Sequence, residues 1–392
     1  MTALAAGLAA MAALLLLWSY AAYPALVSLL ARRAIRPSPR PSLERGEGEG
    51  AEEGPNPGGP PSVEILIAAF DEETVIGRRI ENALAQSYAG SLTVALGCDG
   101  CRDRTADRAR AAGDGRLRVD EFPGRRGKAA VLNDLVSSAR ADLLVFTDAN
   151  SEFAPDAVAR LTAPFADPGV GAVCGRLVLE PAVGAVPTPE TEFWDRETRV
   201  KEAEGRLGVC LGGNGAIYAA RSRLVRPLPP ETALDDFLIP ARIGREGWSV
   251  VFAPDSVASE STAPDVAAEA SRRLRIGIGA GGLLRRERWL FDFRKRPLLS
   301  LAFVSRKAAR WLAPVLGLLA VAAGLASPVL RPFAAAAALL VAVALAAIPL
   351  RPRVGGWPGK LYYFFVMNLA LAAGVAAGLA GYGRPVWNRT AR

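Results

Sequence analysis

The 392-residue sequence contains no histidine, and this absence restricts the chemistry available to it. Histidine is the usual general base near neutral pH, so a general base here must be a carboxylate, lysine, tyrosine or cysteine. Four cysteines are too few for a disulfide framework in a chain of this length. Cys98 and Cys101 have metal-ligand spacing, but no second pair and no histidine complete a tetrahedral zinc site. A zinc site or a redox pair is therefore the weaker interpretation of these two residues.

Aromatic residues make up only 7% of the chain, and the sequence carries no known nucleic-acid-binding motif. The formal net charge is +8, with many arginines beside apolar segments near the two ends and most acidic residues in the middle. Basic residues beside apolar segments are typical of a membrane surface. We therefore expect a lipid bilayer as a partner and no nucleic acid.

A long apolar segment lies near the N-terminus. It runs from about Ala3 to Ala31 and is followed by Arg32, Arg33 and Arg36. A bilayer span needs about 20 residues, and a cleaved signal peptide has a shorter apolar core with its positive charge in front. Residues 1–36 are therefore predicted to form a transmembrane anchor. The positive-inside rule places the arginines and the chain that follows them in the cytoplasm.

The C-terminal part is apolar again. Basic residues interrupt Phe291–Trp311, so we predict an interfacial helix over 289–312, followed by a transmembrane region over 313–392. Three segments there are apolar enough to span a bilayer: Ala313–Ser327, Phe333–Leu350 and Leu361–Tyr382. If all three cross, the arginines near the C-terminus lie outside, against the positive-inside rule. One segment is then re-entrant or interfacial, and the sequence leaves open which.

The middle of the chain alternates short apolar runs with amphipathic segments. Residues 37–62, rich in Pro, Gly, Glu and Ser, precede it and are predicted to be a flexible linker. The predicted strands are Val63–Ala69, Leu92–Leu96 and Asp142–Thr147, and the predicted helices are Glu73–Gln86, Thr105–Ala112, Gly127–Ala139 and Ala154–Phe165. This order predicts an α/β fold with a mostly parallel sheet and flanking helices. Ligands of such sheets bind beyond the carboxyl ends of the strands, so the polar residues there are candidates for a site.

Four polar motifs follow in order: Ala69-Phe-Asp-Glu-Glu73, Cys98-Asp-Gly-Cys-Arg-Asp-Arg-Thr105, Gly124-Arg-Arg-Gly-Lys128 and Phe146-Thr-Asp148-Ala-Asn150. Their order and spacing resemble those of family 2 glycosyltransferases, above all the membrane-bound synthases of cellulose, hyaluronan, chitin and poly-N-acetylglucosamine. The resemblance covers about Val63 to Arg288. It implies a cytoplasmic GT-A type domain over 63–288, an inverting transfer from a nucleotide-sugar, and a multi-pass location in the plasma (inner) membrane.

Six residues are candidates for binding the donor: Glu72, Asp99 and Lys128, and further along the chain Asp148, Arg272 and Arg275. The carboxylate of Asp99 suits the N–H of uracil, a buried hydrogen bond whose loss costs about 1–3 kcal/mol, and this pairing favours a UDP-sugar. Alternatively, Asp99 only forms the turn before Gly100. The resemblance places Glu72 on the nucleotide, although a carboxylate at a helix start has the same pattern. Lys128, at a helix start, suits a diphosphate, and the alternative is a solvated surface lysine.

Asp148 and Asn150 are the candidate metal ligands. Side chains at i and i+2 beyond a buried strand point to the same side, and their oxygens suit Mg²⁺ or Mn²⁺. The resembling family usually has a second aspartate at the position of Asn150, which offers an oxygen without a charge. The alternative is a pair that caps the next helix.

The acceptor and the base are expected in the second half of the domain. The segment Cys210–Arg221 is glycine-rich, and the resemblance places Gly213 and Asn214 at the acceptor, although a simple turn has the same composition. Asp235 and Asp236 resemble the acidic motif of the family, whose last carboxylate is the general base, here Asp236. Two adjacent carboxylates repel, which raises the pKa of one of them. A helix cap is the alternative.

Arg272 and Arg275 resemble the Gln/Arg-x-x-Arg-Trp signature of processive members. Three residues apart, they share one helix face and suit a pyrophosphate, with a basic helix facing a membrane as the alternative. Ile276 replaces the usual tryptophan, which weakens the prediction of processivity. The predicted acceptor is a polysaccharide or other glycan, and the alternative is transfer of a single sugar to a polyprenyl phosphate or another lipid. A non-catalytic nucleotide-sugar sensor is the rival from another class, and the sugar and the oligomeric state stay open.

Overall fold

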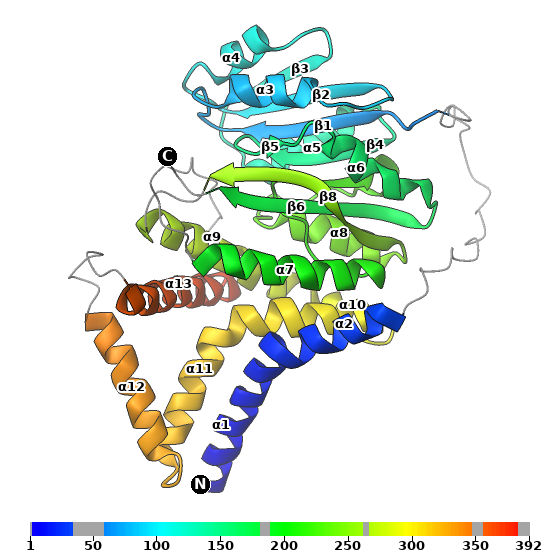
Figure 1. Ribbon diagram of the computed structural model, residues 1–392. Coiled ribbons are helices and arrows are strands. Elements are labelled where there is room, and N and C mark those ends of the chain that lie inside the picture. Colours follow the sequence, from blue (N-terminus) through cyan, green and yellow to red (C-terminus); the bar gives the residue numbers. More distant parts are fainter. Residues whose placement is uncertain (1, 34–58, 181–188, 262–265, 347–355, 383–392) are drawn as a thin grey trace. The chain divides into compact units, whose positions relative to one another are not determined.

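The computed structural model describes residues 2–33, 59–180, 189–261, 266–346 and 356–382 (Figure 1). The chain divides into two compact units. One unit consists mainly of Met1–Val27 and Ala263–Val386, and the other mainly of Ser28–Thr262. The apolar ends of the chain therefore form one unit, and the central segment forms another.

The central unit is built on an eight-stranded sheet in the order β3-β2-β1-β4-β7-β6-β8-β5. The strands are β1 Val63–Ala69, β2 Leu92–Asp99, β3 Leu117–Phe122, β4 Leu143–Asp148, β5 Glu152–Phe153, β6 Val170–Glu180, β7 Tyr218–Arg221 and β8 Ser249–Ser261. β1 pairs in parallel with β2 and β4, and β2 pairs in parallel with β3. β7 runs antiparallel to both β4 and β6, while β6 and β8 are parallel. The predicted α/β class is confirmed, with a parallel first half and a mixed second half.

Strand β1 shows why this sheet forms. All seven of its residues are buried, as expected for a strand that is covered by helices on both faces. Ile65 and Ile67 face the core layer that includes residues of the helices α3 Ile76–Leu84 and α4 Thr105–Ala112. Leu66 faces the opposite layer, which includes residues of α5 Lys128–Ser138. Burial of each such side chain stabilises the fold by about 1.5–3 kcal/mol.

The strand ends define one edge of the sheet. Ala68 lies opposite Gly97 of β2 and Asp148 of β4, so the carboxyl ends of these parallel strands are level. Asp99 ends β2 and Asp148 ends β4. The polar motifs that follow the strands therefore meet at the edge where α/β sheets bind ligands.

The helices of the second half complete the domain. They are α6 Ala157–Thr162, α7 Pro189–Arg206 and α8 Asp235–Arg245. α8 begins with Asp235 and Asp236, whose carboxylates lie where the helix dipole favours negative charge. The glycine-rich segment before β7 and the start of α8 are joined by a hydrogen bond of 2.7 Å from Gly213 N–H to the carbonyl oxygen of Asp236. The acidic motif and the glycine-rich segment are thus neighbours.

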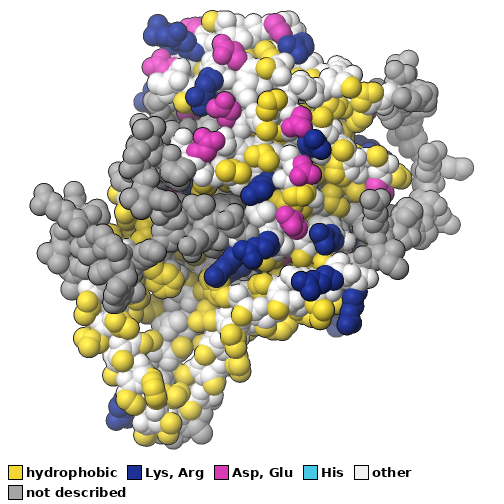
Figure 2. All heavy atoms as spheres, in the orientation of Figure 1, with side chains coloured by type: hydrophobic (Ala, Val, Ile, Leu, Met, Phe, Trp, Pro, Cys, Tyr) yellow, Lys and Arg dark blue, Asp and Glu magenta, His cyan; other side chains and the backbone are white. Residues whose placement is uncertain are grey.

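The other unit contains the apolar helices. Its helices are α1 Thr2–Leu17, the first residues of α2 Tyr23–Arg33, the more polar α9 Val266–Arg286, α10 Pro297–Ala302, α11 Ala309–Ala326, α12 Arg331–Ala346 and α13 Gly356–Leu379. Helical stretches long and apolar enough to cross a membrane are Ala9–Arg33, Pro297–Ala326 and Tyr362–Leu379, with α12 a shorter apolar helix. On the face shown in Figure 2, hydrophobic side chains cover α1, α11 and α12. The prediction of membrane-spanning helices near both ends is confirmed in this sense.

Some predicted boundaries differ from the structure. One helical run, Pro297–Ala326, crosses the boundary expected between the interfacial helix over 289–312 and the span after it, and the interfacial position of 289–312 stays a prediction. Arg306, one of the basic residues on which the interfacial prediction rested, is buried, so it does not form part of a solvated stripe. α9, which we placed in the catalytic domain, belongs to the unit of the apolar helices. Most of the expected linker lies outside the described residues, and its last residue, Ser62, donates two hydrogen bonds of 2.8 and 2.7 Å to Asp142.

Candidate active site

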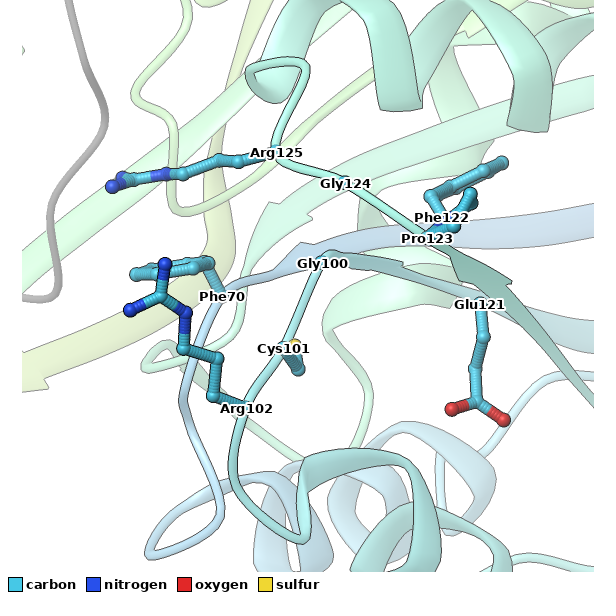
Figure 3. A pocket seen from close by; sticks show the side chains of 9 residues that line it. All are labelled: Phe70, Gly100, Cys101, Arg102, Glu121, Phe122, Pro123, Gly124 and Arg125. Atoms are coloured by element: carbon cyan, nitrogen blue, oxygen red, sulfur yellow. The ribbon is translucent and has the colours of Figure 1, made fainter.

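A pocket of about 730 Å³ opens beyond the carboxyl ends of β1, β2 and β3 (Figure 3). Its lining residues are Phe70, Gly100, Cys101, Arg102, Glu121, Phe122, Pro123, Gly124 and Arg125. The Arg125 guanidinium lies 3.8 Å from the centre of the Phe70 ring, a cation–π arrangement. Figure 3 shows Phe70, Arg102 and Arg125 gathered on one side of the segment that contains Gly100. Aromatic and guanidinium planes suit a flat base and phosphates, and sequence reasoning missed these three side chains.

Asp99 lies fully buried beside this pocket. Its two carboxylate oxygens accept hydrogen bonds from the backbone N–H groups of Arg126, at 2.7 Å, and Gly127, at 2.9 Å. Gly100 has a φ of +66°, and a Cβ atom there would lie 2.7 Å from the carbonyl carbon of Gly124. Asp99 therefore ties the loop after β2 to the loop before α5. Each carboxylate oxygen keeps a second lone pair, so a contact with uracil stays a prediction.

The residues around Glu72 form a tightly hydrogen-bonded turn. Glu72 N–H donates to Thr105 Oγ1 at 2.8 Å, and its carbonyl oxygen accepts from the start of α3. Nearby, Asp71, Cys101 and Asp103 form a group whose geometry could hold a metal ion. Asp71 and Asp103 already accept backbone hydrogen bonds from Arg102 and Glu73, respectively, so turn formation explains this group. A contact between the Glu72 carboxylate and a nucleotide stays a prediction.

Cys98 and Cys101 lie close enough for their thiols to interact. Both are unbridged, Cys98 is buried and Cys101 is half-buried at the pocket. A hydrogen bond from the Cys98 thiol lowers the pKa of Cys101, while that interaction and burial raise the pKa of Cys98. Cys101 is therefore the more reactive thiol of the pair.

The site centres on Lys128, the first residue of α5. Its ammonium nitrogen lies 2.8 Å from Oδ1 of Asp148 and 3.1 Å from Oδ1 of Asp235. Burial by itself lowers the pKa of Lys128, but the charges of Asp148 and Asp235 outweigh this effect and raise it. A charged lysine thus joins the candidate metal ligand to the acidic motif, although we predicted only a contact with diphosphate. The diphosphate contact stays a prediction.

Asp148 is held in place by its neighbours. The preceding Thr147 donates to the carbonyl oxygen of Ala216 at 2.7 Å and accepts from Arg79 at 3.2 Å. A Cβ atom on Gly215 would lie 2.6 Å from Oδ2 of Asp148, so glycine is needed for this close approach. The Asp148 side chain keeps 30% of its surface exposed. Burial lowers the pKa of Arg79 to about 9, an effect that Glu152 and Asp148 oppose, so the guanidinium stays charged at neutral pH.

The donor atoms of Asp148 and Asn150 fit a hard divalent cation. Asp148 offers carboxylate oxygens at the half-buried end of β4, and Asn150, also half-buried, offers an amide oxygen two residues further on. Oxygen ligands of this kind suit Mg²⁺ or Mn²⁺. The assignment of these two residues as metal ligands stays a prediction.

The glycine-rich segment is fixed by buried charges of α7. The buried Lys201 ammonium donates to Oδ1 of Asn214, and the Asn214 amide donates to the carbonyl oxygen of Gly175 at 3.3 Å. The buried Glu204 carboxylate accepts from Leu211 N–H at 3.2 Å. Both ends of the Asn214 side chain are therefore engaged inside the protein, and its role at the acceptor stays a prediction. Lys201 and Glu204 were not predicted from the sequence. They lie three residues apart on the buried face of α7, next to Val200.

The two adjacent carboxylates of α8 have different surroundings. Asp235 is only 4% exposed, contacts Lys128 and accepts a hydrogen bond of 3.1 Å from the Tyr218 hydroxyl. Burial and the charges of Asp235 and Asp236 raise the pKa of Tyr218, so its hydroxyl stays protonated and donates. Asp236 is only half-buried. Asp235 is thus the more enclosed carboxylate, and Asp236 is the one more open to a substrate.

Arg272 and Arg275 lie on α9, in the other unit of the chain. Arg272 lies 3.8 Å from Glu269, and Arg273 lies 2.8 Å from the same carboxylate. A contact of Arg272 or Arg275 with the donor stays a prediction.

Comparison with known proteins shows where the chain belongs. Residues 60–279, more than half of the chain, match the family described as glycosyltransferase like family 2. Among curated relatives, an N-acetylglucosaminyltransferase of Rhizobium leguminosarum bv. viciae is 29% identical over 172 residues, covering 42% of this chain and 40% of the relative. One of Rhizobium leguminosarum bv. trifolii is 34% identical over 123 residues, covering 30% of this chain and 68% of the relative. The chain therefore spans less than half the length of the first of these relatives.

A solved structure agrees with this fold over nearly the whole chain. It is the mannosyltransferase PcManGT from Pyrobaculum calidifontis in complex with GDP-Man and Mn²⁺, with a TM-score of 0.65 and 22% sequence identity. The likeness covers 95% of this chain and 99% of that one and shows a shared fold, of the GT-A type. Together with the family match and the polar motifs at one edge of the sheet, it places the protein: the chain belongs to glycosyltransferase family 2.

Proposed function

We propose that the protein is a membrane-bound, inverting glycosyltransferase that moves a sugar from a UDP-sugar to a glycan acceptor. The observation that carries the proposal is the contact of Lys128 with both Asp148 and Asp235, at the edge of the sheet where the pocket opens. The Lys128 ammonium, between the end of β4 and the acidic start of α8, would stabilise the negative charge of a departing diphosphate. UDP-N-acetylglucosamine is the first donor to test, because the curated relatives are named N-acetylglucosaminyltransferases.

The pocket supports a nucleotide donor. Phe70 and Arg125 offer stacked planes for a base, and Arg102 and Arg125 offer positive charge for phosphate oxygens. Lys128 lies at the N-terminus of α5, where free N–H groups also favour an anion. The base is thus expected in the pocket and the diphosphate toward Lys128.

The half-buried Asp236 is proposed as the general base. It removes the proton of the acceptor hydroxyl, whose oxygen then bonds to the anomeric carbon of the donor. The bond from that carbon to the phosphate oxygen breaks, and UDP leaves with the bonding electrons on the opposite face, which inverts the configuration. Mg²⁺ or Mn²⁺, held by Asp148 and Asn150, would supply charge that stabilises the departing diphosphate. Lys128 adds a fixed positive charge to the same region and lies 3.1 Å from Oδ1 of Asp235.

The protein purified in detergent, given a panel of nucleotide-sugars, tests this function. UDP-N-acetylglucosamine, UDP-glucose, UDP-galactose and GDP-mannose are each supplied with Mg²⁺ or Mn²⁺, and the released nucleoside diphosphate is measured. We expect release from one UDP-sugar, abolished by EDTA and restored by added metal. Binding of UDP without turnover of any donor, with glycan and lipid acceptors both supplied, would instead support a nucleotide-sugar sensor.

Transfer of one sugar to a lipid such as a polyprenyl phosphate is the second candidate. The small number of apolar helices after the central unit favours it: in the described residues only Pro297–Ala326 and Tyr362–Leu379 are long and apolar enough to cross a membrane there, whereas a channel for a growing polymer needs several spans. The length of the product separates the candidates, because a polysaccharide synthase gives a ladder and a lipid transferase gives a single addition. Release of GDP from GDP-mannose with a single-sugar product would support the second candidate.

A further inference from the structure

Helices α9 and α13 lie side by side in backbone contact. A Cβ atom on Gly277 would lie 2.5 Å from the carbonyl oxygen of Leu371, and one on Gly374 would collide with the backbone of α9. The same close approach recurs one turn later, at Gly281 and Gly378. Residue numbers increase together in the two pairs of contacts, so α9 and α13 run parallel to each other. The two helices therefore lie at the same level relative to a membrane surface. In Figure 1, α13 runs alongside α9 and crosswise to α11 and α12.

Helix α9 is too polar to cross a membrane. Its apolar segment, Ile276–Leu284, is far shorter than the roughly 20 residues that a span needs. Arg272, Arg273 and Arg275 precede this segment, and Arg285 and Arg286 follow it at the end of the helix. Basic residues at both ends of so short a segment keep α9 at the membrane–water interface or above it. A helix in backbone contact with this segment is held at the same level.

We propose that α13 lies along the surface of the cytoplasmic leaflet beside α9 and does not cross the membrane. The proposal rests on the membrane location of the proposed function. α11 and α12 then form the hairpin that crosses the bilayer, with the turn near Val329 outside, and the chain after α13 returns to the cytoplasm. α12 covers Arg331–Ala346, and its apolar sequence continues to Leu350, which gives it enough length.

The side chains of α13 fit a lipid surface. Phe364 is 57% exposed and Leu369 is 51% exposed, while the glycines Gly374 and Gly378 face α9. The pair is amphipathic as a whole, because α9 supplies arginines and α13 supplies exposed apolar side chains. Tyr362 and Tyr363, in the second turn of α13, are residues that favour the headgroup region.

The charges of the sequence agree with this arrangement. With α13 at the interface, Arg384, Arg389 and Arg392 lie on the cytoplasmic side, as the positive-inside rule requires. Arg351 and Arg353, between α12 and α13, also lie on that side. A crossing α13 would place the first three outside.

Single cysteines at two exposed positions test the topology. Val329→Cys lies in the turn between α11 and α12, and Tyr382→Cys lies just after α13, where the native side chains are 78% and 75% exposed. Both are made in a Cys101→Ser background, which leaves the buried Cys98, Cys174 and Cys210 as native thiols. A membrane-impermeant maleimide is applied to intact cells, to everted membrane vesicles and to SDS-denatured samples, which give the total labelling.

The expected result is labelling of Val329→Cys in intact cells and of Tyr382→Cys only in everted vesicles. Labelling of both from outside would show that α13 crosses and would overturn the proposal. Labelling of neither from outside would show that the α11–α12 turn does not reach the outer face, which also overturns it. Transferase activity of the wild-type protein is measured separately. If the labelling contradicts the topology but the protein is active, only the topology is overturned. If the labelling is as expected but the protein is inactive, only the proposed function is overturned.

Discussion

The Lys128 ammonium lies 2.8 Å from a carboxylate oxygen of Asp148, and this contact joins the start of α5 to the end of β4, which carries the candidate metal ligand. The same ammonium reaches Asp235, which is almost fully enclosed. Lys128 thus contacts both carboxylates. Substitution of Lys128 therefore alters the surroundings of the candidate metal ligand Asp148 and of the acidic motif at the same time.

Replacement of Lys128 by methionine should impair activity and stability together. Asp235 is left as a buried charge without this partner, which costs about 3–5 kcal/mol in comparable buried pairs. We expect transfer to fall by about 10²-fold or more, as when an electrostatic donor to a developing anion is removed. Lys128→Arg, which keeps the charge, is the control and should unfold close to the wild-type temperature. Steady-state kinetics and thermal unfolding measure the two effects, and wild-type values for Lys128→Met would contradict this role.

Gly215→Ala should disturb Asp148 specifically. The added Cβ atom would lie 2.6 Å from Oδ2 of Asp148, so that carboxylate has to move. We expect a higher Mn²⁺ concentration for half-maximal activity, with UDP binding in the absence of metal little changed. The matched control is Gly115→Ala, because a Cβ atom at Gly115 meets nothing within 4 Å. An unchanged metal requirement in Gly215→Ala would argue against Asp148 as a ligand.

Lys201→Met should make the glycine-rich segment less rigid without weakening the binding of UDP. The variant removes the hydrogen bond to Asn214, a buried group whose unmet oxygen costs about 1–3 kcal/mol. The expected result is a lower kcat with an unchanged Kd for UDP, because the segment lies between Asp148 and Asp236 and not in the pocket. Arg199→Met, at an exposed position of the same helix, should behave like wild type. Equal losses in both variants would indicate a general effect on α7.

Alkylation of Cys101 should be blocked by the donor nucleotide. The thiol lines the pocket, and its hydrogen bond from Cys98 lowers its pKa, so the reactive thiolate persists to lower pH than in an ordinary cysteine. We expect iodoacetamide to modify Cys101 at neutral pH, with UDP slowing the reaction. Mass spectrometry of the modified peptide measures the rate, and Cys101→Ser gives the background. The same rate with saturating UDP would place the nucleotide elsewhere.

Much of the fold follows from hydrophobic periodicity, and the exceptions have physical causes. The strand Val63–Ala69 and the helix Thr105–Ala112 have the predicted bounds, because the core dictates their patterns directly. Leu117–Phe122 was missed because it is the edge strand β3, with charged and half-buried residues. β6 and β8 are paired partners far apart in the sequence, and local patterns carry no information on such pairing.

The candidate site shows the same division. Motifs that follow strands pointed to Asp99 and Asp148, because the carboxyl ends of parallel strands meet at one edge. The acidic pair, Asp235 and Asp236, was predicted from its resemblance to the family's acidic motif. The bridging role of Lys128 and the anchoring of the glycine-rich segment by Lys201 depend on contacts between distant segments. The only sequence signal for Lys201 was an opposite charge three residues later, at Glu204. Solvent-exposed helices show the same pattern, so it did not indicate a buried lysine.

The measurement that most directly tests the proposed mechanism is a comparison of donor binding and transfer in Asp236→Asn. Calorimetry gives the Kd for UDP, and UDP release with the preferred donor and its metal gives the transfer rate. With Asp236 as general base, the variant binds UDP as the wild type does and transfers at a rate lower by about 10²–10⁴-fold, the usual contribution of a general base. Transfer at the wild-type rate by a variant that binds UDP normally would contradict the assignment of Asp236.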